Sequence, residues 1–357
     1  MKNIYLQLSE FVPVSMQLVL ATVISTRGST PQKAGSSALF SSSELICGTV
    51  GGGVLEGRVQ KIAMEAATNG GSYIYRFDLN KDIYFREEAI CGGQVEVLVD
   101  ASVQNHQPLF NKIKALLHEK TPCAMVTIFS ETSYGGGKTD RFVLTANGTG
   151  HIPEQYKKKI QEEANRLLVS LNPDDFCRME LQLPGEEEKK IAFIEPLFPP
   201  LRLVIAGAGH IGKALCHIGK LLDFEVTVID DRIEFANSEN LPDADKIIVE
   251  NIGKALQGID KEQDTYIVVV TRGHNDDAEA LKQCIGSRAA YVGMIGSRTK
   301  IEKMHSNFVQ NGWTSEDQWK SVHAPVGLDI LSKSVEEIAI SIAAELVLER
   351  NRKNSKK

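Results

Sequence analysis

The stretch LRLVIAGAGHIGKAL, residues 201–215, joins an apolar run to a helical pattern through three closely spaced glycines. The apolar run is typical of a strand that is buried on both faces, and the helical pattern continues to about Asp223. Further strands are predicted at FEVTVIDD (224–231), DKIIVE (245–250), TYIVVVT (265–271) and AAYVGMIGS (289–297). Helical patterns follow the last two of them. Apolar strands that alternate with helices predict an α/β fold with a doubly wound parallel sheet.

The residues before this region predict a separate α+β domain. Strand-like runs such as QLVLATVIST and CAMVTIFS are separated by turns, with helical stretches near 54–69, 108–119 and 153–171. The sequence EPLFPP places the domain boundary near Pro196–Pro200, because proline neither donates to a ladder nor continues a helix. We predict an N-terminal domain over residues 1–196, a Rossmann-like domain over 201–350 and a basic disordered tail over 351–357.

Composition and charge narrow the class of protein. A length of 357 residues suits two domains, and 42% hydrophobic with 24% charged residues is typical of a globular chain. The net charge of −6 disfavours nucleic-acid binding, which needs a concentrated basic surface. No apolar run approaches the roughly 20 residues of a membrane span, and the first residues do not resemble a secretion signal. We therefore expect a cytoplasmic protein without membrane contact.

GAGHIG, residues 207–212, has the setting of a dinucleotide-binding turn, because it closes a strand and opens a helix. Gly207 makes the turn, Gly209 lets phosphate oxygens approach the backbone, and Gly212 packs the helix on the strand. Asp230, at the end of the next strand, would accept hydrogen bonds from ribose hydroxyls and disfavour a 2′-phosphate. The alternative is that the glycines only shape a turn and Asp230 only begins an acidic loop. The complete setting favours phosphate or nucleotide binding.

Three further polar stretches lie where a doubly wound sheet places its ligands. They are TRGHNDD after the fourth predicted strand, GMIGSRTK after the fifth and HAPVGLDI before the last helix. Each alone is typical of helix capping, but the carboxyl ends of parallel strands meet at one edge of the sheet. We therefore expect an anion-binding crevice lined by His210, Arg272, His274, Ser297, Arg298 and His323.

Two loops and one cysteine are candidate site residues in the first domain. Gly51–Gly53 lie between a strand and a helix, where they could form an anion nest, and Arg27 lies in a second polar loop. Plain turns explain each loop equally well when it is taken alone. Cys91 precedes two glycines and a strand, so it is either a packing residue or a thiol that contacts a ligand. The six cysteines lie at least 32 residues apart, which predicts neither a zinc site nor a disulfide framework.

Together these stretches resemble the XdhC/CoxI family, accessory proteins that handle molybdenum cofactor for xanthine dehydrogenase and related molybdenum hydroxylases. The resemblance covers nearly the whole chain. In the first domain it rests on ATVISTRGSTPQKAG, GTVGGGVLEGRV and CGGQVEVLVD. In the second it rests on GAGHIGKAL, VIDDRIEFAN, TRGHNDD, YVGMIGSRTK and HAPVGLDI, followed by EEIAISIAAE.

The resemblance implies a maturation factor, a chaperone that binds molybdopterin, presents it for sulfuration by a cysteine desulfurase and delivers it to an apo molybdenum hydroxylase of the xanthine dehydrogenase type. It also implies self-association, here as a homodimer. The sequence shows no four-cysteine iron–sulfur spacing, so a dehydrogenase name would mislead for this chain. We expect the cofactor, nucleotide-free or as a dinucleotide, to lie between the domains. Its phosphate or nucleotide end would lie at Gly207–Gly212, and its dithiolene or metal toward Gly51–Gly53 and the Cys91 sulfur.

Two other functions fit the same residues. An NAD-dependent oxidoreductase would use the glycine turn and Asp230, with His274 or His210 as the proton-transfer residue. Neither histidine has a partner visible in the sequence. A pure interaction protein would keep the Rossmann-like half as a scaffold only. The ligand retained after purification distinguishes these functions.

Overall fold

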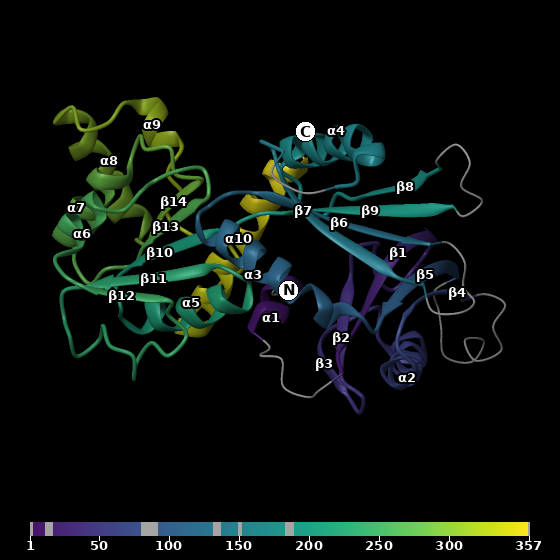
Figure 1. Ribbon diagram of the computed structural model, residues 1–357. Helices are drawn as coiled ribbons and strands as arrows, with labels where there is room; N and C mark the ends of the chain where they lie inside the picture. Colours follow the sequence, from purple (N-terminus) through teal and green to yellow (C-terminus); the bar gives the residue numbers. More distant parts are fainter. Residues whose placement is uncertain are drawn as a thin grey trace. The chain divides into compact units, whose positions relative to one another are not determined.

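The structure, a computed structural model, describes residues 3–10, 17–79, 92–130, 137–148, 152–182 and 189–355 (Figure 1). The chain divides into two compact units: unit 1 spans Met1–Pro199 and unit 2 spans Pro200–Lys357. Each unit has its own sheets and apolar cores, so the two are described separately.

Unit 2 contains a five-stranded parallel sheet in the order β12-β11-β10-β13-β14. The strands are β10 (Arg202–Ala206), β11 (Glu225–Asp230), β12 (Lys246–Val249), β13 (Thr265–Val269) and β14 (Tyr291–Met294). The strand order therefore reverses between β10 and β13, which is the point where Rossmann folds bind ligands. Each strand lies where the sequence predicts one, and the predicted Rossmann-like fold is confirmed.

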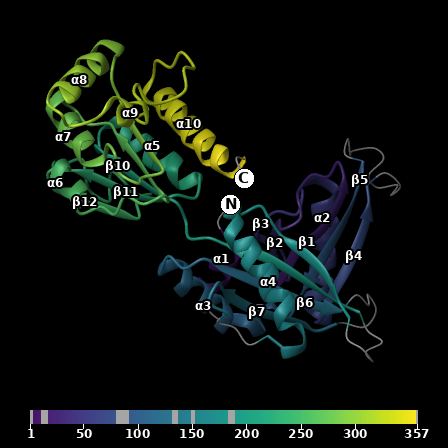
Figure 2. The ribbon, with the colours of Figure 1, turned by 90° about the horizontal axis from the view of Figure 1, so that it is seen from above.

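Helices cover both faces of this sheet, which explains why its strands are apolar throughout. One layer consists of α5 (His210–Leu221) and α10 (Val335–Ser355). The other consists of α6 (Ile252–Gln257), α7 (His274–Cys284) and α8 (Arg298–Gln310), with the short α9 (Glu316–Lys320) after it. Figure 2 shows the sheet between the two layers. Each layer closes a separate apolar cluster against its face of the sheet.

The last helix is longer than the sequence analysis predicts. Its start is a capping box, in which the Glu337 amide donates to Ser334 Oγ at 3.2 Å and the Ser334 amide donates to Glu337 Oε2 at 3.0 Å. The helix continues to Ser355, so the first five residues of the expected disordered tail are helical. Arg352, a good helix former, supports this extension by pairing with Glu349 one turn earlier. No helix of the described chain is both long and apolar enough to cross a membrane.

Unit 1 is an α+β unit built on two antiparallel sheets. The first has the order β3-β2-β1-β5-β4 and the second has the order β7-β6-β9-β8. The strands of the first sheet are β1 (Val19–Gly28), β2 (Ser37–Phe40), β3 (Leu45–Gly48), β4 (Ser72–Asp78) and β5 (Gly93–Asp100). Those of the second are β6 (Cys123–Ser130), β7 (Thr139–Thr145), β8 (Cys177–Leu181) and β9 (Lys190–Leu197).

Helices complete the cores of unit 1. They are α1 (Ile4–Glu10), α2 (Gly53–Asn69), the 3₁₀ turn η2 (Val103–His106), α3 (Gln107–His118) and α4 (Glu154–Ser170). Helix α4 packs on one face of the second sheet, where Ile160 and Leu167 meet Val126 and Ile194. The other face shares apolar clusters with the first sheet, through contacts that include Phe193.

Pro196 is part of a strand, although the sequence analysis treats it as a breaker. It lies in β9, paired with Ala124 of β6, while the pairing with β8 on the other side stops at Ile194. Proline lacks only the amide donor of a hydrogen bond. At Pro196 the β8 side of the strand has no pairing that would need such a donor. The described unit 1 also has α1, which the sequence analysis does not single out as an element.

A buried ion pair joins β5 to β7. Arg141 Nη1 donates to Asp100 Oδ2, and the two side chains are only 2% and 0% exposed. Asp100 Oδ1 also accepts from Ser72 Oγ at 2.7 Å and from Ser102 Oγ at 2.6 Å. Burial alone would raise the pKa of Asp100, but Arg141 and the two hydroxyls hold it below its usual value. The charge of this carboxylate is therefore balanced inside the unit.

We expect Arg141→Leu to lower the free energy of unfolding by about 3–5 kcal/mol, because Asp100 would stay buried without its cation. Arg166, 58% exposed in its ion pair with Glu163, is the control. Arg166→Leu should cost less than about 1 kcal/mol. Urea unfolding of the full chain, followed by circular dichroism, measures both losses. Equal losses in the two variants would contradict the role given to burial.

Glu195 is a buried carboxyl group of unit 1. This β9 side chain is buried and accepts a hydrogen bond from the Tyr5 hydroxyl at 2.6 Å. Burial raises the pKa of Glu195 from its ordinary 4.5 to about 7, against the smaller opposite effects of the Tyr5 bond and the Arg141 charge. The folded chain thus binds a proton that the unfolded chain releases at lower pH.

The free energy of unfolding should therefore fall as pH rises from about 4.5 through about 7, and Glu195→Gln should remove that part of the dependence. This contribution to stability is fully present at pH values below the pKa of Glu195 in the unfolded chain. It is lost as the pH rises through the pKa of Glu195 in the folded chain. Urea unfolding at about pH 5 and about pH 8 compares the two chains. Parallel profiles for wild type and Glu195→Gln would refute the assignment.

Candidate functional site

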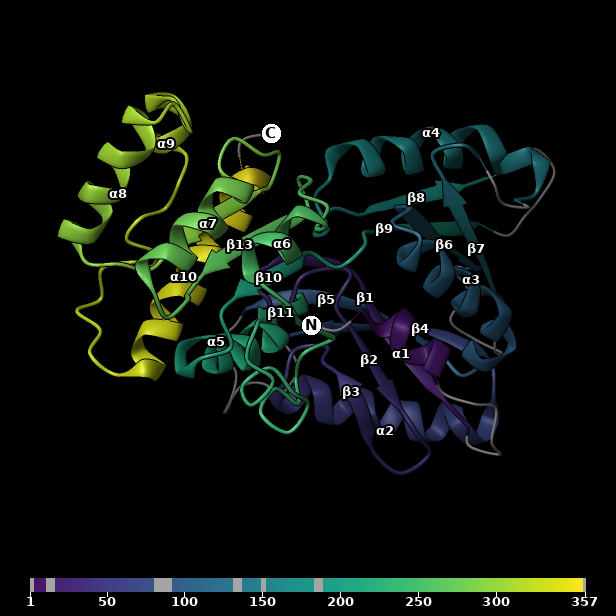
Figure 3. The same cartoon turned by 90° about the vertical axis from the view of Figure 1, so that its left-hand side faces the viewer.

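The parallel sheet of unit 2 brings most of the predicted site residues to one edge. Strands β10, β11, β13 and β14 end at Ala206, Asp230, Val269 and Met294, and all run in the same direction. Because the four strands are neighbours in one parallel sheet, the loops that follow these ends are next to one another; β10, β11 and β13 are labelled in Figure 3. Site residues on these four strand ends are Gly207, Gly209, His210, Gly212, Asp230, Arg272, His274, Ser297 and Arg298.

Two of the three glycines in the turn after β10 are required by packing. Gly207 has φ +121°, and a Cβ there would lie 2.5 Å from the Val270 carbonyl oxygen. A Cβ on Gly212 would lie 1.9 Å from the Gly207 oxygen. Gly209 differs: its φ is −68°, and a Cβ there would meet nothing within 4 Å. The backbone at Gly209, which caps α5 without a side-chain hydrogen bond, has room for another molecule.

Asp230 does not present a free carboxylate at this edge. It is 2% exposed, and its Oδ2 accepts from the Ala208 amide at 2.7 Å and from Arg232 Nη2 at 2.8 Å. Its Oδ1 accepts from Arg232 Nε at 2.8 Å and from the Arg232 amide at 3.1 Å. Burial alone would raise the pKa of Asp230, but these bonds keep it below its usual value. The carboxylate expected to hold ribose hydroxyls is thus occupied by the protein itself.

A second buried carboxylate joins the loop after β13 to helix α8. Asp277 is fully buried; it accepts from Thr271 Oγ1 at 2.5 Å and from Lys300 Nζ. Ser297 caps α8, because the Lys300 amide donates to its Oγ at 3.3 Å. These bonds fix the two loops to each other and leave the exposed Arg272 beside them.

The three predicted site histidines lie in different surroundings. His210 is exposed at the first residue of α5, and His274 begins α7, although its side chain lies outside the described atoms. The His323 backbone pairs with Gly293, one residue before the end of β14, and its Nδ1 lies 3.0 Å from Glu345 Oε1 on α10. Glu345 also accepts from the Tyr291 hydroxyl. The Glu345 carboxylate therefore holds the His323 ring on the α10 side of the sheet.

In unit 1, close backbone contacts bring the glycine motifs together. Gly28 has φ +79° and pairs with Gly93, and a Cβ on Gly93 would lie 2.6 Å from the Ser29 carbonyl oxygen. A Cβ on Gly51 would lie 3.0 Å from Pro31 in the same loop. The exposed Arg27 ends β1 at this place. The loop after β1 thus touches both the Gly92-Gly93 turn and the Gly51–Gly53 turn.

The Gly51–Gly53 turn already holds one carboxylate of the protein. Glu56 Oε2, in the first turn of α2, accepts from Thr49 Oγ1 at 2.5 Å and from the Val50 amide at 3.3 Å. The Gly51 amide donates to Thr49 Oγ1 at 3.1 Å. Gly52 and Gly53 have φ +66° and +56°, with nothing within 4 Å of a Cβ on either. Only these last two positions leave room for a ligand.

Cys91 lies outside the described residues, so its candidate role stays a prediction. Among the described cysteines, burial raises the pKa of Cys123 and Cys284 to about 12 and that of Cys216 to about 11. Such thiols are poor nucleophiles near neutral pH. No group of three or more histidine, cysteine or acidic side chains within the described ranges could hold a metal ion.

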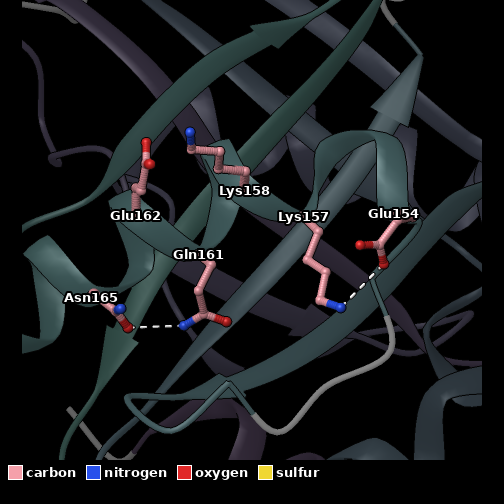
Figure 4. Close-up of a pocket in the computed structure, with 6 residues that line it drawn as sticks. All are labelled: Glu154, Lys157, Lys158, Gln161, Glu162 and Asn165. Atoms are coloured by element: carbon pink, nitrogen blue, oxygen red, sulfur yellow. Dashed lines mark hydrogen bonds and ion pairs between the residues drawn. The ribbon is translucent and has the colours of Figure 1, made fainter.

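The pocket shown in Figure 4 is not a candidate site. All six lining residues belong to α4, and they interact with one another: Lys157 Nζ lies 3.1 Å from Glu154, and Gln161 donates to Asn165 at 2.8 Å. Within the described ranges, no second element contributes a group to it. The lining residues are Glu154, Lys157, Lys158, Gln161, Glu162 and Asn165.

Sequence reasoning misses Arg232, Lys300 and Glu345. Arg232 stands two residues after Asp230 and Lys300 three after Ser297, so both lie inside or beside stretches already singled out. A cation next to an acidic strand end is the signal that could have found Arg232. Nothing local marks Glu345, which reaches His323 from 22 residues along the chain.

Comparison with known proteins identifies the family. Residues 203–346 match the model of the XdhC Rossmann domain, and residues 15–78 match that of the XdhC and CoxI family. This chain belongs to the XdhC and CoxI family. Over 99% of both chains the protein is 24% identical to a Bacillus subtilis protein that is named as a probable xanthine dehydrogenase subunit.

Two further likenesses differ in extent. This XdhC/CoxI protein is 33% identical to the uncharacterized protein YqeB of Escherichia coli over 151 residues, which is 42% of this chain and 27% of that protein. A crystal structure described as a xanthine dehydrogenase from Bacillus halodurans covers 98% of this chain, with 96% of its own length, a TM-score of 0.77 and 21% identity. The second likeness shows that the fold of the whole chain is shared.

The different contacts of the glycines predict different stabilities. Gly212→Ala should lower the free energy of unfolding by about 3 kcal/mol, because the new methyl group would overlap the Gly207 oxygen. Gly209→Ala, three residues earlier, should cost less than about 1 kcal/mol, because the space around it is open. Urea unfolding measures both. A loss in Gly209→Ala as large as that in Gly212→Ala would show that Gly209 is held by packing.

Proposed function

We propose that this protein is an accessory factor that binds molybdenum cofactor as molybdopterin and assists its sulfuration and insertion into a molybdenum hydroxylase of the xanthine dehydrogenase type. Family membership, together with a relative of equal length whose name links it to xanthine dehydrogenase, supports the association with such an enzyme. The chain has six cysteines, none of them closely spaced, which suits a partner of the hydroxylase better than the iron–sulfur enzyme itself.

The observation that carries the binding proposal is Gly209. Neither a positive φ nor a close neighbour requires glycine at this position, yet the residue stands at the amino end of α5. A glycine there keeps the amides at the start of the helix accessible, and such amides with the helix dipole favour phosphate. The phosphate or nucleotide end of the cofactor would bind at Gly207–Gly212, with the exposed Arg272 and Arg298 adding positive charge.

The remaining parts of the cofactor and its partners are assigned by the family resemblance. The dithiolene end would use Gly52, Gly53 and Cys91 of unit 1. A cysteine desulfurase would supply sulfur, the apo-hydroxylase would receive the cofactor, and the factor would act as a homodimer. The open space at Gly52 and Gly53 supports the first of these assignments.

We expect molybdopterin to co-purify with the protein and to be lost in Gly209→Asp, because a carboxylate at the helix start would repel phosphate and fill its place. Gly258→Asp is the matched control, since Gly258 follows α6 and lies before β13, at the opposite edge of the sheet. Mass spectrometry of anaerobically purified protein quantifies the retained pterin. The proposal fails if wild type retains no pterin or if Gly209→Asp retains as much as Gly258→Asp.

A further inference from the structure

The turn after β11 contains an arginine in a fixed orientation. Arg232 donates through Nε and Nη2 to the two oxygens of Asp230, each at 2.8 Å. Its guanidinium carbon lies 4.0 Å from the centre of the Phe235 ring. The amides of Phe235 and Ala236 donate to the Arg232 carbonyl at 3.0 and 2.9 Å. Backbone, ring and carboxylate therefore hold this guanidinium at the end of β11.

The hydrogen-bond capacity of Asp230 is used up by the protein. A carboxylate offers about four lone-pair positions, and four N–H groups of Ala208 and Arg232 point at this one. Ribose hydroxyls would have to displace one of them. The negative charge that would repel a second phosphate is likewise balanced by the guanidinium.

Arg232 itself has donors to spare. A guanidinium carries five N–H groups, and two of them go to Asp230. Within the described residues, Nη1 has no hydrogen-bond partner, and the side chain is 19% exposed. Planar arginine donors match phosphate oxygens in pairs. In a Rossmann fold, the end of the second strand is where a ribose 2′-phosphate is met by arginine.

We infer that Arg232 selects a 2′-phosphorylated adenine nucleotide at the turn after β11, while Asp230 acts as the residue that positions it. This reverses the preference that Asp230 alone suggests from the sequence. The inference rests on the proposed phosphate site at Gly207–Gly212, where the 5′-phosphate of this nucleotide would take the place of the cofactor's phosphate, so the two ligands would exclude each other. Asp231 and Glu234 also lie near Arg232, but both are exposed to water and weaken its attraction for phosphate only in part.

Two probes that differ only in the 2′-phosphate test the inference: adenosine 2′,5′-bisphosphate and adenosine 5′-monophosphate. We expect the bisphosphate to bind the full-length protein at least about tenfold tighter by isothermal titration calorimetry, because a charge-assisted pair is gained. Arg232→Gln should remove this ratio, and Arg232→Lys should retain part of it. Arg288→Gln is the control, because Arg288 pairs with Glu262 near the starts of β13 and β14.

Equal binding of the two probes to wild type, or a ratio unchanged in Arg232→Gln, would overturn the inference. Thermal unfolding of each variant shows whether it is folded, and Arg232→Lys keeps the test open if Arg232→Gln is not. Retained molybdopterin is measured on the same preparations. Its loss in Gly209→Asp alongside equal probe binding would leave the proposed function standing and reject Arg232 selection. Selective binding of the bisphosphate without any retained pterin would support Arg232 selection and reject the proposed function.

Discussion

A close backbone contact at Gly207 is the constraint on which the rest of unit 2 depends. The Gly207 amide donates to the Ile229 carbonyl at 2.8 Å, and a Cβ on Gly207 would lie 2.5 Å from the Val270 oxygen. One residue without a side chain thus meets the ends of β11 and β13 at once. Because Gly212 meets Gly207 in turn, the amino end of α5 is fixed above the same edge. Packing alone therefore puts the first amides of α5 where the strand order reverses.

The φ angle and the neighbours that a Cβ would meet separate the motif glycines into two classes. Gly28, Gly51 and Gly93 have a close neighbour or a positive φ, so folding explains them without any ligand. Gly52 and Gly53 have open surroundings but positive φ, so their conformation explains them. Gly209 has neither requirement. Gly57 inside α2 also lacks both requirements, so what favours phosphate binding at Gly209 is its position at the amino end of α5.

Much of the fold can be predicted from the sequence, because the strands of unit 2 are continuous apolar runs between helical patterns. Pro196 shows where local rules fail: whether a strand tolerates proline depends on which side has a partner, and the pairing with β8 ends at Ile194. Asp230 shows the same for the site. Its place at the strand end follows from the sequence, but its partner Arg232 depends on how the next turn folds back. Contacts such as His323 with Glu345 join distant segments and leave no local pattern.

The kind of group at the strand ends of unit 2 suits a protein that holds a ligand and then releases it. The buried carboxylates are already paired, Asp230 with Arg232 and Asp277 with Lys300, so they hold the loops and need not be rearranged by a ligand. The groups that remain accessible to a ligand are the backbone amides at the start of α5 and the exposed arginines. Exposed cations are screened by water and salt, so each adds modest affinity and little selectivity. A ligand held by exposed groups of this kind can dissociate faster than one held by buried, unpaired charges.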